Sequence, residues 1–349
     1  MAATYKRWVG HWRKLDPHHA REALARVEAL RQRGNVSDTE ARDVTHKSGL
    51  PGWSKTRLDR VALLLRARAQ TAFESHASEV GPARPPSSFL PGATPHQRGL
   101  WGLGRIGRQI GEGTHATLWE VEGGKERNLA VRVVRASEAG NFELRALEAS
   151  QGLPFFPRYF RTHEADGLRF IFVENLKAFS TLGRAEDVRF VPEHLGDAVR
   201  IAVNLLRGLR ALHGRGVVHG DIYPHNLLFN RALGPDGIRM VDLGNARPLE
   251  EHFTRRADVD VYRTALVLVG LITGHAPGWG VHQTGSREEV EACLQSIRVP
   301  ELKAVLRRAV SPEPTERFPT AQALRDALRP FENSSVPLAG GAERERSAG

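Results

Sequence analysis

The stretch that decides the fold is His219-Gly220-Asp221-Ile222-Tyr223-Pro224-His225-Asn226. A helix is predicted before it, over residues 202–212, and an apolar run follows it at residues 227–229. After a turn rich in Gly, Pro and Asp comes a second polar signature, Val241-Asp242-Leu243-Gly244.

The spacing of three polar residues in these stretches suits phosphoryl transfer from a nucleotide. Asp221 is followed five residues later by Asn226, and Asp242 ends an apolar run. Asp221 would orient an acceptor hydroxyl, while Asn226 and Asp242 would hold magnesium. The alternative is a helix-loop-strand unit with incidental polar residues, which a lone His-x-Asp would favour. The three residues together favour the phosphoryl-transfer interpretation.

Composition sets broad limits on the class of protein. The chain has 349 residues and a formal charge of +10, and its one cysteine, Cys293, excludes a disulfide framework or a cysteine metal cluster. No apolar signal segment opens the sequence, and no apolar run reaches the ~18 residues of a membrane span. We therefore expect a cytoplasmic protein without a membrane partner.

The positive charge is concentrated near the N-terminus. Residues 1–75 hold 15 Lys/Arg and 8 Asp/Glu. This asymmetry points to nucleic acid, an acidic partner or an anionic surface. The alternative is an Arg-rich composition with solvated helix faces.

Residues 1–75 are predicted to form a small all-α module. Asp16-Pro17 opens one helix, Ser37-x-x-Glu40 is a capping box that opens another, and Ser54 begins a third. Residues 49–61, Gly-Leu-Pro-Gly-Trp-Ser-Lys-Thr-Arg-Leu-Asp-Arg-Val, resemble the helix-extended-helix module of SAP and Rho N-terminal domains. That resemblance implies binding to DNA or RNA phosphates, and the alternative is a protein-docking module. The implied contact residues are Lys55, Arg57 and Arg60.

Pro and Gly set the expected boundaries. Residues 76–100 are rich in both and predict an extended, partly ordered linker. A second domain is predicted over residues 101–331. Residues 332–349, rich in Ser, Gly and alternating Glu/Arg, predict a disordered tail.

The second domain begins with signals for a nucleotide-phosphate site. Gly111 and Gly113 lie in a turn between two predicted strands, where the backbone can approach phosphates closely. The next strand carries Arg132, and a following helix carries Glu143, so a cation paired to a carboxylate would hold the α- and β-phosphates. A later apolar strand runs into residues 174–176, whose backbone could bond an adenine edge.

Taken in order, these pieces resemble the protein-kinase fold over nearly the whole second domain. The resemblance implies an α+β bilobal fold, with a small β-rich N-lobe and a helical C-lobe preceded by the all-α module. Asp260 would open a buried helix and tie to the catalytic-loop backbone, and residues 302–328 look like the last helices of Ser/Thr protein kinases. Those helices argue against aminoglycoside-type small-molecule kinases.

The resemblance also implies the roles of individual residues. Catalysis would involve Asp221, Arg132, Glu143 and Asn226, and Mg²⁺ would be held by Asn226 and Asp242. The implied ATP-binding residues are Gly111, Gly113, Ala130, Arg132, Glu174 and Leu176.

Four departures from the family pattern bear on activity. Arg132 replaces the strand Lys, and its planar fork is not interchangeable with an ammonium. Tyr223 replaces a Lys that contacts the transferred phosphate, and Gly220 replaces an Arg that docks a phosphorylated activation loop. Residues 245–259 form a segment shorter than usual, so the platform for a protein substrate is reduced.

The expected function is therefore an atypical ATP-dependent kinase that phosphorylates Ser or Thr of a protein. Two alternatives stay open. In the first, the chain would be a pseudokinase scaffold that binds nucleotide or a protein partner without transferring phosphate. In the second, it would be a small-molecule phosphotransferase.

Overall fold

The structure is a computed structural model of the whole chain, and it divides into two compact units. One unit comprises residues 1–84 with 111–117, and the other comprises residues 85–110 with 118–349. The residues described are 26–27, 37, 39–40, 81–92, 97–113, 116–136, 140–184, 187–188, 190–249, 254–275 and 287–338.

The chain forms a five-stranded sheet with the order β1-β2-β3-β5-β4. Both β3 and β4 pair antiparallel with β5, and Arg132 of β3 lies opposite Ile171 of β5. The strands of the sheet are β1 (Arg105–Glu112), β2 (Ala116–Glu122), β3 (Leu129–Arg135), β4 (Tyr159–Ala165) and β5 (Leu168–Glu174).

Alternation along β3 decides which of its side chains face the core. Leu129, Val131 and Val133 join one cluster of buried apolar side chains. Successive side chains of a strand point to opposite faces, so Ala130 and Arg132 lie on the other face of the sheet. One strand thus supplies both the core and a cation for the site.

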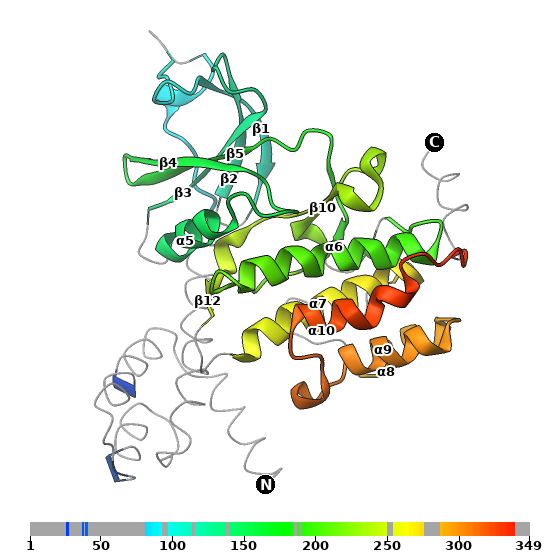
Figure 1. Cartoon of the computed structure of the whole chain (residues 1–349). Coiled ribbons are helices and arrows are strands. Elements are labelled where there is room, and N and C mark those ends of the chain that lie inside the picture. Colours follow the sequence, from blue (N-terminus) through cyan, green and yellow to red (C-terminus); the bar gives the residue numbers. More distant parts are fainter. Residues whose placement is uncertain are drawn as a thin grey trace. The chain divides into compact units, whose positions relative to one another are not determined.

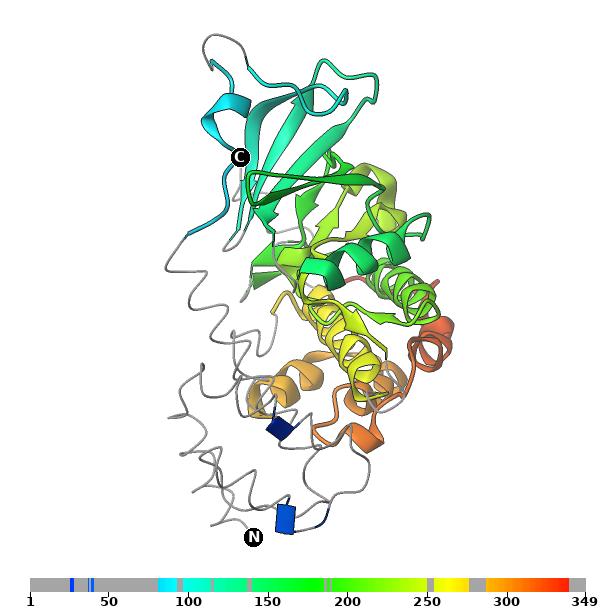
Figure 2. The same ribbon diagram turned by 90° about the vertical axis from the view of Figure 1, so that its left-hand side faces the viewer.

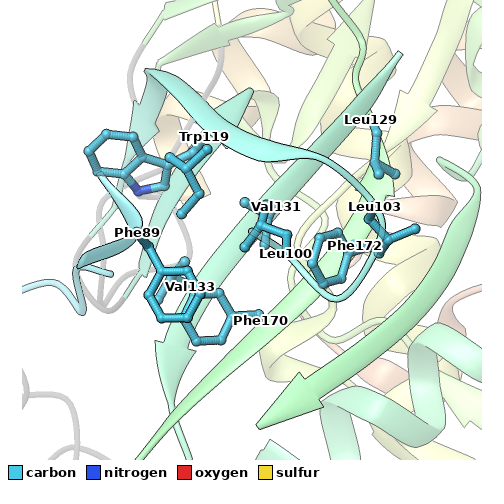
Figure 3. Close-up of a cluster of buried hydrophobic side chains, with 10 residues drawn as sticks. Phe89, Leu100, Leu103, Trp119, Leu129, Val131, Val133, Phe170 and Phe172 are labelled. Carbon is cyan, nitrogen blue, oxygen red and sulfur yellow. The ribbon is translucent and has the colours of Figure 1, made fainter. Parts of the chain in front are cut away.

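The segment before β1 belongs to this core. Phe89 and Leu100 are fully buried against Phe170 and Phe172, and Figure 3 shows these side chains gathered over one face of the sheet. Residues 85–92 and 97–100, expected to be part of an extended linker, therefore pack within the domain. The linker prediction rested on the Pro and Gly content. The free energy gained by burying apolar side chains such as Phe89 is large enough to hold this segment against the sheet despite that content.

The rest of the larger unit is mainly helical (Figure 1, Figure 2). Helices α6, α7 and α10 pack side by side, and α8 and α9 contact each other and α7. The helices are α5 (Gly140–Ser150), α6 (Leu195–His213), α7 (Thr254–Thr273), α8 (Arg287–Ser296), α9 (Pro300–Ala309) and α10 (Ala321–Leu328).

Short strands and turns connect the sheet to the helices. Strand β10 pairs with β6 and β11, β12 pairs with β9, and β7 pairs with β8. The short strands are β6 (Ser180–Thr181), β7 (Gly183–Arg184), β8 (Asp187–Val188), β9 (Val217–Val218), β10 (Leu227–Phe229), β11 (Ile238–Met240) and β12 (Arg247–Pro248). Six 3-10 turns are described: η2 (Ser87–Phe89), η3 (Pro224–Asn226), η4 (Arg231–Gly237), η5 (Leu243–Asn245), η7 (Pro314–Glu316) and η8 (Arg329–Phe331).

The start of α6 is capped by the end of the described chain. The backbone N–H groups of Leu195 and Gly196 donate to the carbonyls of Val336 (2.9 Å) and Ser334 (3.0 Å). The first N–H groups of a helix have no partner within the helix, so these carbonyls satisfy them. Residues 332–338 are therefore ordered, and the disordered tail expected from residue 332 cannot begin before residue 339.

Most of the predicted all-α module, including Lys55, Arg57 and Arg60, lies outside the described residues. The Ser37 capping box is described and is confirmed. The N–H of Ser37 donates to the Glu40 carboxylate (3.0 Å), and the N–H of Glu40 donates to the Ser37 hydroxyl (3.3 Å). None of the described helices is both long enough and apolar enough to cross a bilayer.

Candidate active site

The loop that carries Asp221 is fixed by a buried carboxylate of α7. Asp260 is fully buried, and it accepts hydrogen bonds from the backbone N–H groups of His219 (2.9 Å) and Gly220 (2.8 Å). Its second partner group is the Nε2 of His213, at 2.8 Å. The expected tie between Asp260 and the loop backbone is confirmed, and the loop is held to the longest described helix.

Asp221 is oriented by two amide side chains. One carboxylate oxygen, Oδ2, accepts from the Nδ2 of Asn226 (2.8 Å) and from the Nδ2 of Asn245 (3.1 Å). The same Asn226 nitrogen also donates to the Asp221 carbonyl (3.1 Å). Because Asn226 uses its nitrogen toward Asp221, its amide oxygen is left to accept from, or coordinate, something else.

Asp242 lies next to this loop, at the start of η5. The N–H of Val241 donates to the Asn226 carbonyl (2.9 Å), so the two segments are joined by backbone. Asp242 adopts a left-handed conformation, with φ of 63°, and its carboxylate accepts from the N–H of Gly244 (3.2 Å). A non-glycine residue in this region is uncommon and is often found at functional sites.

Arg132 links three elements in this site. Its Nη1 pairs with the carboxylate of Glu143 on α5, and its Nη2 lies 3.1 Å from the Oδ1 of Asp242. The Glu143 side chain is 9 % exposed and that of Asp242 is 44 % exposed, so the two carboxylates differ in hydration. The expected pairing of a strand cation with a helix carboxylate is confirmed, and the contact to Asp242 adds a third group.

The charge of Arg132 also changes the titration of Asp242. The nearby guanidinium is the largest cause that lowers the pKa of Asp242 below its ordinary value of 3.8, and burial opposes it. Asp242 is therefore an anion at neutral pH, as a carboxyl group that binds a metal must be.

The predicted adenine edge is the end of β5 and the residues after it. Leu129 and Ala130 of β3 lie opposite Glu174 and Val173 of β5, and Ala130 is buried. The N–H of Leu176 makes no hydrogen bond among the described residues, whereas its carbonyl accepts from Phe179 (3.0 Å). This link therefore offers a backbone donor.

The structure brings Asp221, Asn226, Asp242, Arg132 and Glu143 together. Side-chain contacts join Asp221 to Asn226 and join Arg132 to Glu143 and Asp242, and the N–H of Val241 links Asn226 to the segment of Asp242. Ala130 lies on β3, Glu174 ends β5, and Leu176 lies in the link that follows β5. Gly111 lies near the end of β1, and Gly113 lies in the turn before β2. Both residues belong to the smaller compact unit, which comprises residues 1–84 and 111–117.

Comparison with known proteins agrees with this arrangement. The model of the protein kinase domain matches residues 105–328, which is more than half of the chain. The chain belongs to the protein kinase family. The kinase domain therefore contains both the sheet and the helices that build the site.

Individual relatives of this kinase domain are distant. CDPK-related kinase 5 of Arabidopsis thaliana is 22 % identical over 74 % of this chain and 51 % of its own. Serine/threonine-protein kinase PkaB of Streptomyces coelicolor is 28 % identical over 50 % of this chain and 49 % of its own. PknJ of Mycobacterium tuberculosis is 27 % identical over 62 % and 43 %. The chain thus spans about half the length, or less, of these relatives.

Among solved structures, the kinase domain of Mycobacterium tuberculosis PknI is similar to this chain. The match has a TM-score of 0.49 and 19 % identity, and it covers 65 % of this chain and 95 % of that one.

One departure from the kinase pattern has a local explanation in the structure. Gly220 has a φ of 77°, and a Cβ there would lie 2.8 Å from the carbonyl oxygen of Asn245. An arginine at this position would combine backbone strain with a clash. From its place at the start of this loop, His219 would be expected to brace the loop through hydrogen bonds. Its ring nitrogens are instead buried with no partner among the described residues. It stacks near Phe156, with ring centroids 6.4 Å apart.

The segment between η5 and α7 is even shorter than predicted. Helix α7 begins at Thr254 rather than near Asp260, so only residues 246–253 lie between the two elements. The sequence also offers Glu250 and Glu251 as partners of Arg317, and both lie outside the described residues. Among the described residues, Arg317 lies 3.6 Å from Asp258 of α7.

Sequence reasoning missed two residues of this site, Asn245 and Arg263. Asn245 contacts Asp221 although 24 positions separate them. Arg263 lies over the ring of Tyr223, with its Cζ 4.3 Å from the ring centroid. A cation inside the apolar run of α7 was the one signal for Arg263, and Asn245 gave none beyond its place after Gly244.

Proposed function

We propose that this kinase domain transfers the γ-phosphate of Mg·ATP to a Ser or Thr hydroxyl of a protein. The observation that carries the proposal is the convergence of the three polar groups. The amide of Asn226 donates to the carboxylate of Asp221 (2.8 Å). Val241, the residue before Asp242, donates its N–H to the Asn226 carbonyl. The match to the protein kinase domain supports ATP as the phosphate donor.

Asp221 is suited to receive the proton of the acceptor hydroxyl. Its Oδ2 is occupied by two amide donors, which leaves Oδ1 to face the hydroxyl. As the hydroxyl oxygen bonds to the γ-phosphorus, its proton passes to Asp221 and the bond to the β–γ bridging oxygen breaks, so that ADP leaves. Most of the rate enhancement would come from positioning and from charge.

The donor set fits magnesium. Asn226 presents its amide oxygen and Asp242 its second carboxylate oxygen, and Mg²⁺ commonly takes one or two protein oxygens together with substrate phosphates. The described residues contain no group of three or more His, Cys, Asp or Glu that could form an all-protein metal cage. When bound, the metal neutralises charge that develops on the phosphates.

Arg132 would contact the nucleotide phosphates. Its side chain is 22 % exposed and is aligned by Glu143, so the guanidinium is held in one place while keeping access to ligand. The Ser/Thr specificity is supported by relatives such as PkaB and PknJ, whose names state serine/threonine-protein kinase.

A pseudokinase is the second candidate, and one contact favours it. The Arg132 Nη2 lies 3.1 Å from Asp242 and so competes with a metal for that carboxylate. A protein that binds nucleotide weakly, or not at all, could keep this pair.

A radiolabelled phosphate-transfer assay separates the candidates. Wild type, Asp221→Asn and the control Asp326→Asn, an acid on the exposed face of α10, are incubated with labelled ATP, magnesium and mixed protein acceptors. The kinase proposal expects label from wild type and the control but little from Asp221→Asn. Equal label from all three rejects it. A thermal shift with Mg·ATP then tells a nucleotide-binding pseudokinase from an empty one, and label on a metabolite alone indicates a small-molecule phosphotransferase.

We also propose that residues 1–75 bind nucleic acid in a salt-sensitive way. The support is the basic charge of this region and the likeness of residues 49–61 to SAP and Rho N-terminal modules. A gel shift with the full chain tests it at low and high salt, against a variant with Gln at Lys55, Arg57 and Arg60. No shift at low salt, or an equal shift for the variant, rejects it in favour of protein docking.

A further inference from the structure

The position two residues after Asp221 lacks a positive charge of its own. Tyr223 occupies it, and burial is the main cause that raises the pKa of its hydroxyl above the ordinary value of 10.0. The hydroxyl is therefore neutral at physiological pH. The negative charge that builds up on a transferred phosphoryl group still needs a cation close by.

An arginine from another element stands beside this tyrosine. The Cζ of Arg263, on α7, lies 4.3 Å from the centroid of the Tyr223 ring. Stacking of this kind fixes the plane of a guanidinium. A hydrogen bond between the side chains of Arg263 and Tyr223 holds it further, so only part of the guanidinium edge remains available. Tyr223 thus acts as a platform for a cation that the loop itself does not carry.

The placement of Arg263 relative to Asp221 is rigid. Arg263 lies three residues after Asp260 on α7, so the two side chains leave the same side of the helix. Asp260 holds the N–H groups of His219 and Gly220, which directly precede Asp221. The helix that positions the catalytic loop therefore positions this guanidinium as well.

The guanidinium also has unused binding capacity. Its Nη1 is buried and makes no hydrogen bond to any described residue. The nearest acids on α7 are already engaged, because Asp260 accepts from the loop and from His213, and Asp258 pairs with Arg317. A buried charged nitrogen without a partner is costly, so an anionic oxygen that arrives with substrate would be bound strongly.

We propose that Arg263 binds the γ-phosphate during transfer and so supplies, from α7, the charge missing at position 223. The inference rests on the proposed function, since it assigns a further residue to the same reaction. The alternative source of an anionic oxygen is an acidic side chain of the protein acceptor, and the experiment distinguishes the two.

The test compares Arg263→Gln with wild type by steady-state kinetics and by calorimetric binding of Mg·ATP and Mg·ADP. We expect kcat to fall about 10²–10³-fold, with the KM for the acceptor unchanged. The preference for ATP over ADP should fall about tenfold, the effect of one charge-assisted hydrogen bond. Arg308→Gln is the matched control, because Arg308 also lies 4.3 Å from an aromatic ring centroid, that of Phe318, on the remote helix α9.

Rescue separates a phosphate contact from a structural role. The double variant Tyr223→Lys with Arg263→Gln should recover part of the lost kcat, because it restores a cation beside Asp221. Arg263→Lys, which keeps the charge, serves if the Gln variant does not fold. The proposal is overturned if only the acceptor KM changes, if kcat and the ATP preference stay at wild-type values, or if the added Lys recovers nothing. If wild type transfers no phosphate, the kinase proposal fails first, and the ATP-to-ADP preference alone then decides the role of Arg263.

Discussion

Replacing Arg132 by lysine should make this kinase domain bind magnesium more readily. The guanidinium fork reaches Glu143 with one nitrogen and Asp242 with the other. A lysine has a single ammonium, and it should remain with Glu143, whose side chain is 9 % exposed, because ion pairs are stronger where solvent is excluded. Asp242 would then be released for the metal.

The size of the effect follows from the contact to Asp242. Unit charges at about 4 Å attract by ~1 kcal/mol in water and ~4 kcal/mol near a protein surface. The Asp242 side chain is 44 % exposed, so solvent screens its attraction to Arg132 and the interaction energy of the pair should be ~0.5–1 kcal/mol. Since 1.4 kcal/mol corresponds to a factor of ten, the magnesium concentration at half-saturation should fall about 2–5-fold.

The assay titrates magnesium at fixed ATP and follows the melting temperature, so it does not depend on turnover. Arg132→Met is the comparison, because it leaves the buried Glu143 carboxylate without its cation and should destabilise the fold by about 3 kcal/mol. A lysine variant that melts like wild type in the absence of ligand but needs equal or more magnesium would refute the reasoning.

Three further predictions follow from the same geometry. Asp260→Ala removes a fully buried acceptor of three hydrogen bonds and should lower the unfolding free energy by about 3–5 kcal/mol in urea; a loss below ~1 kcal/mol would contradict it. Gly220→Ala should lower the melting temperature more than Gly216→Ala does, because a Cβ at Gly220 (φ of 77°) would lie 2.8 Å from a carbonyl oxygen, whereas Gly216 (φ of 73°) has open space around it. Equal melting temperatures for the two variants would count against the clash. Because Arg132 lowers the pKa of Asp242 below 3.8, the stability that wild type gains over Asp242→Asn should be constant above that pH and shrink in stronger acid; a gain that shrinks already near neutral pH would be inconsistent with this.

Sequence spacing and the resemblance to protein kinases together predicted part of the site. Asp221 and Asn226 lie on one short loop, and the leading acid of a buried helix was expected to hold that loop, which Asp260 does. Pairing of Arg132 with Glu143 was also expected, because a cation on a strand followed by a carboxylate on a helix suits a phosphate site.

Contacts set only by tertiary packing could not be predicted in this way. The second partner of Arg132, the amide of Asn245 on Asp221 and the stacking of Arg263 on Tyr223 each join distant segments. The linker prediction was wrong for a related reason at residues 85–92 and 97–100. Composition marked residues 76–100 as a linker, but Phe89 is buried in the core of the sheet.

The central claim is that Asn226 and Asp242 hold magnesium with ATP in front of Asp221. A crystal structure with magnesium and a non-hydrolysable ATP analogue tests it most directly. We predict a metal at about 2.0–2.1 Å from the amide oxygen of Asn226 and from a carboxylate oxygen of Asp242, with the γ-phosphate facing Asp221. A structure at saturating nucleotide in which Asp242 keeps its contact to Arg132 and neither residue touches a metal would contradict the account.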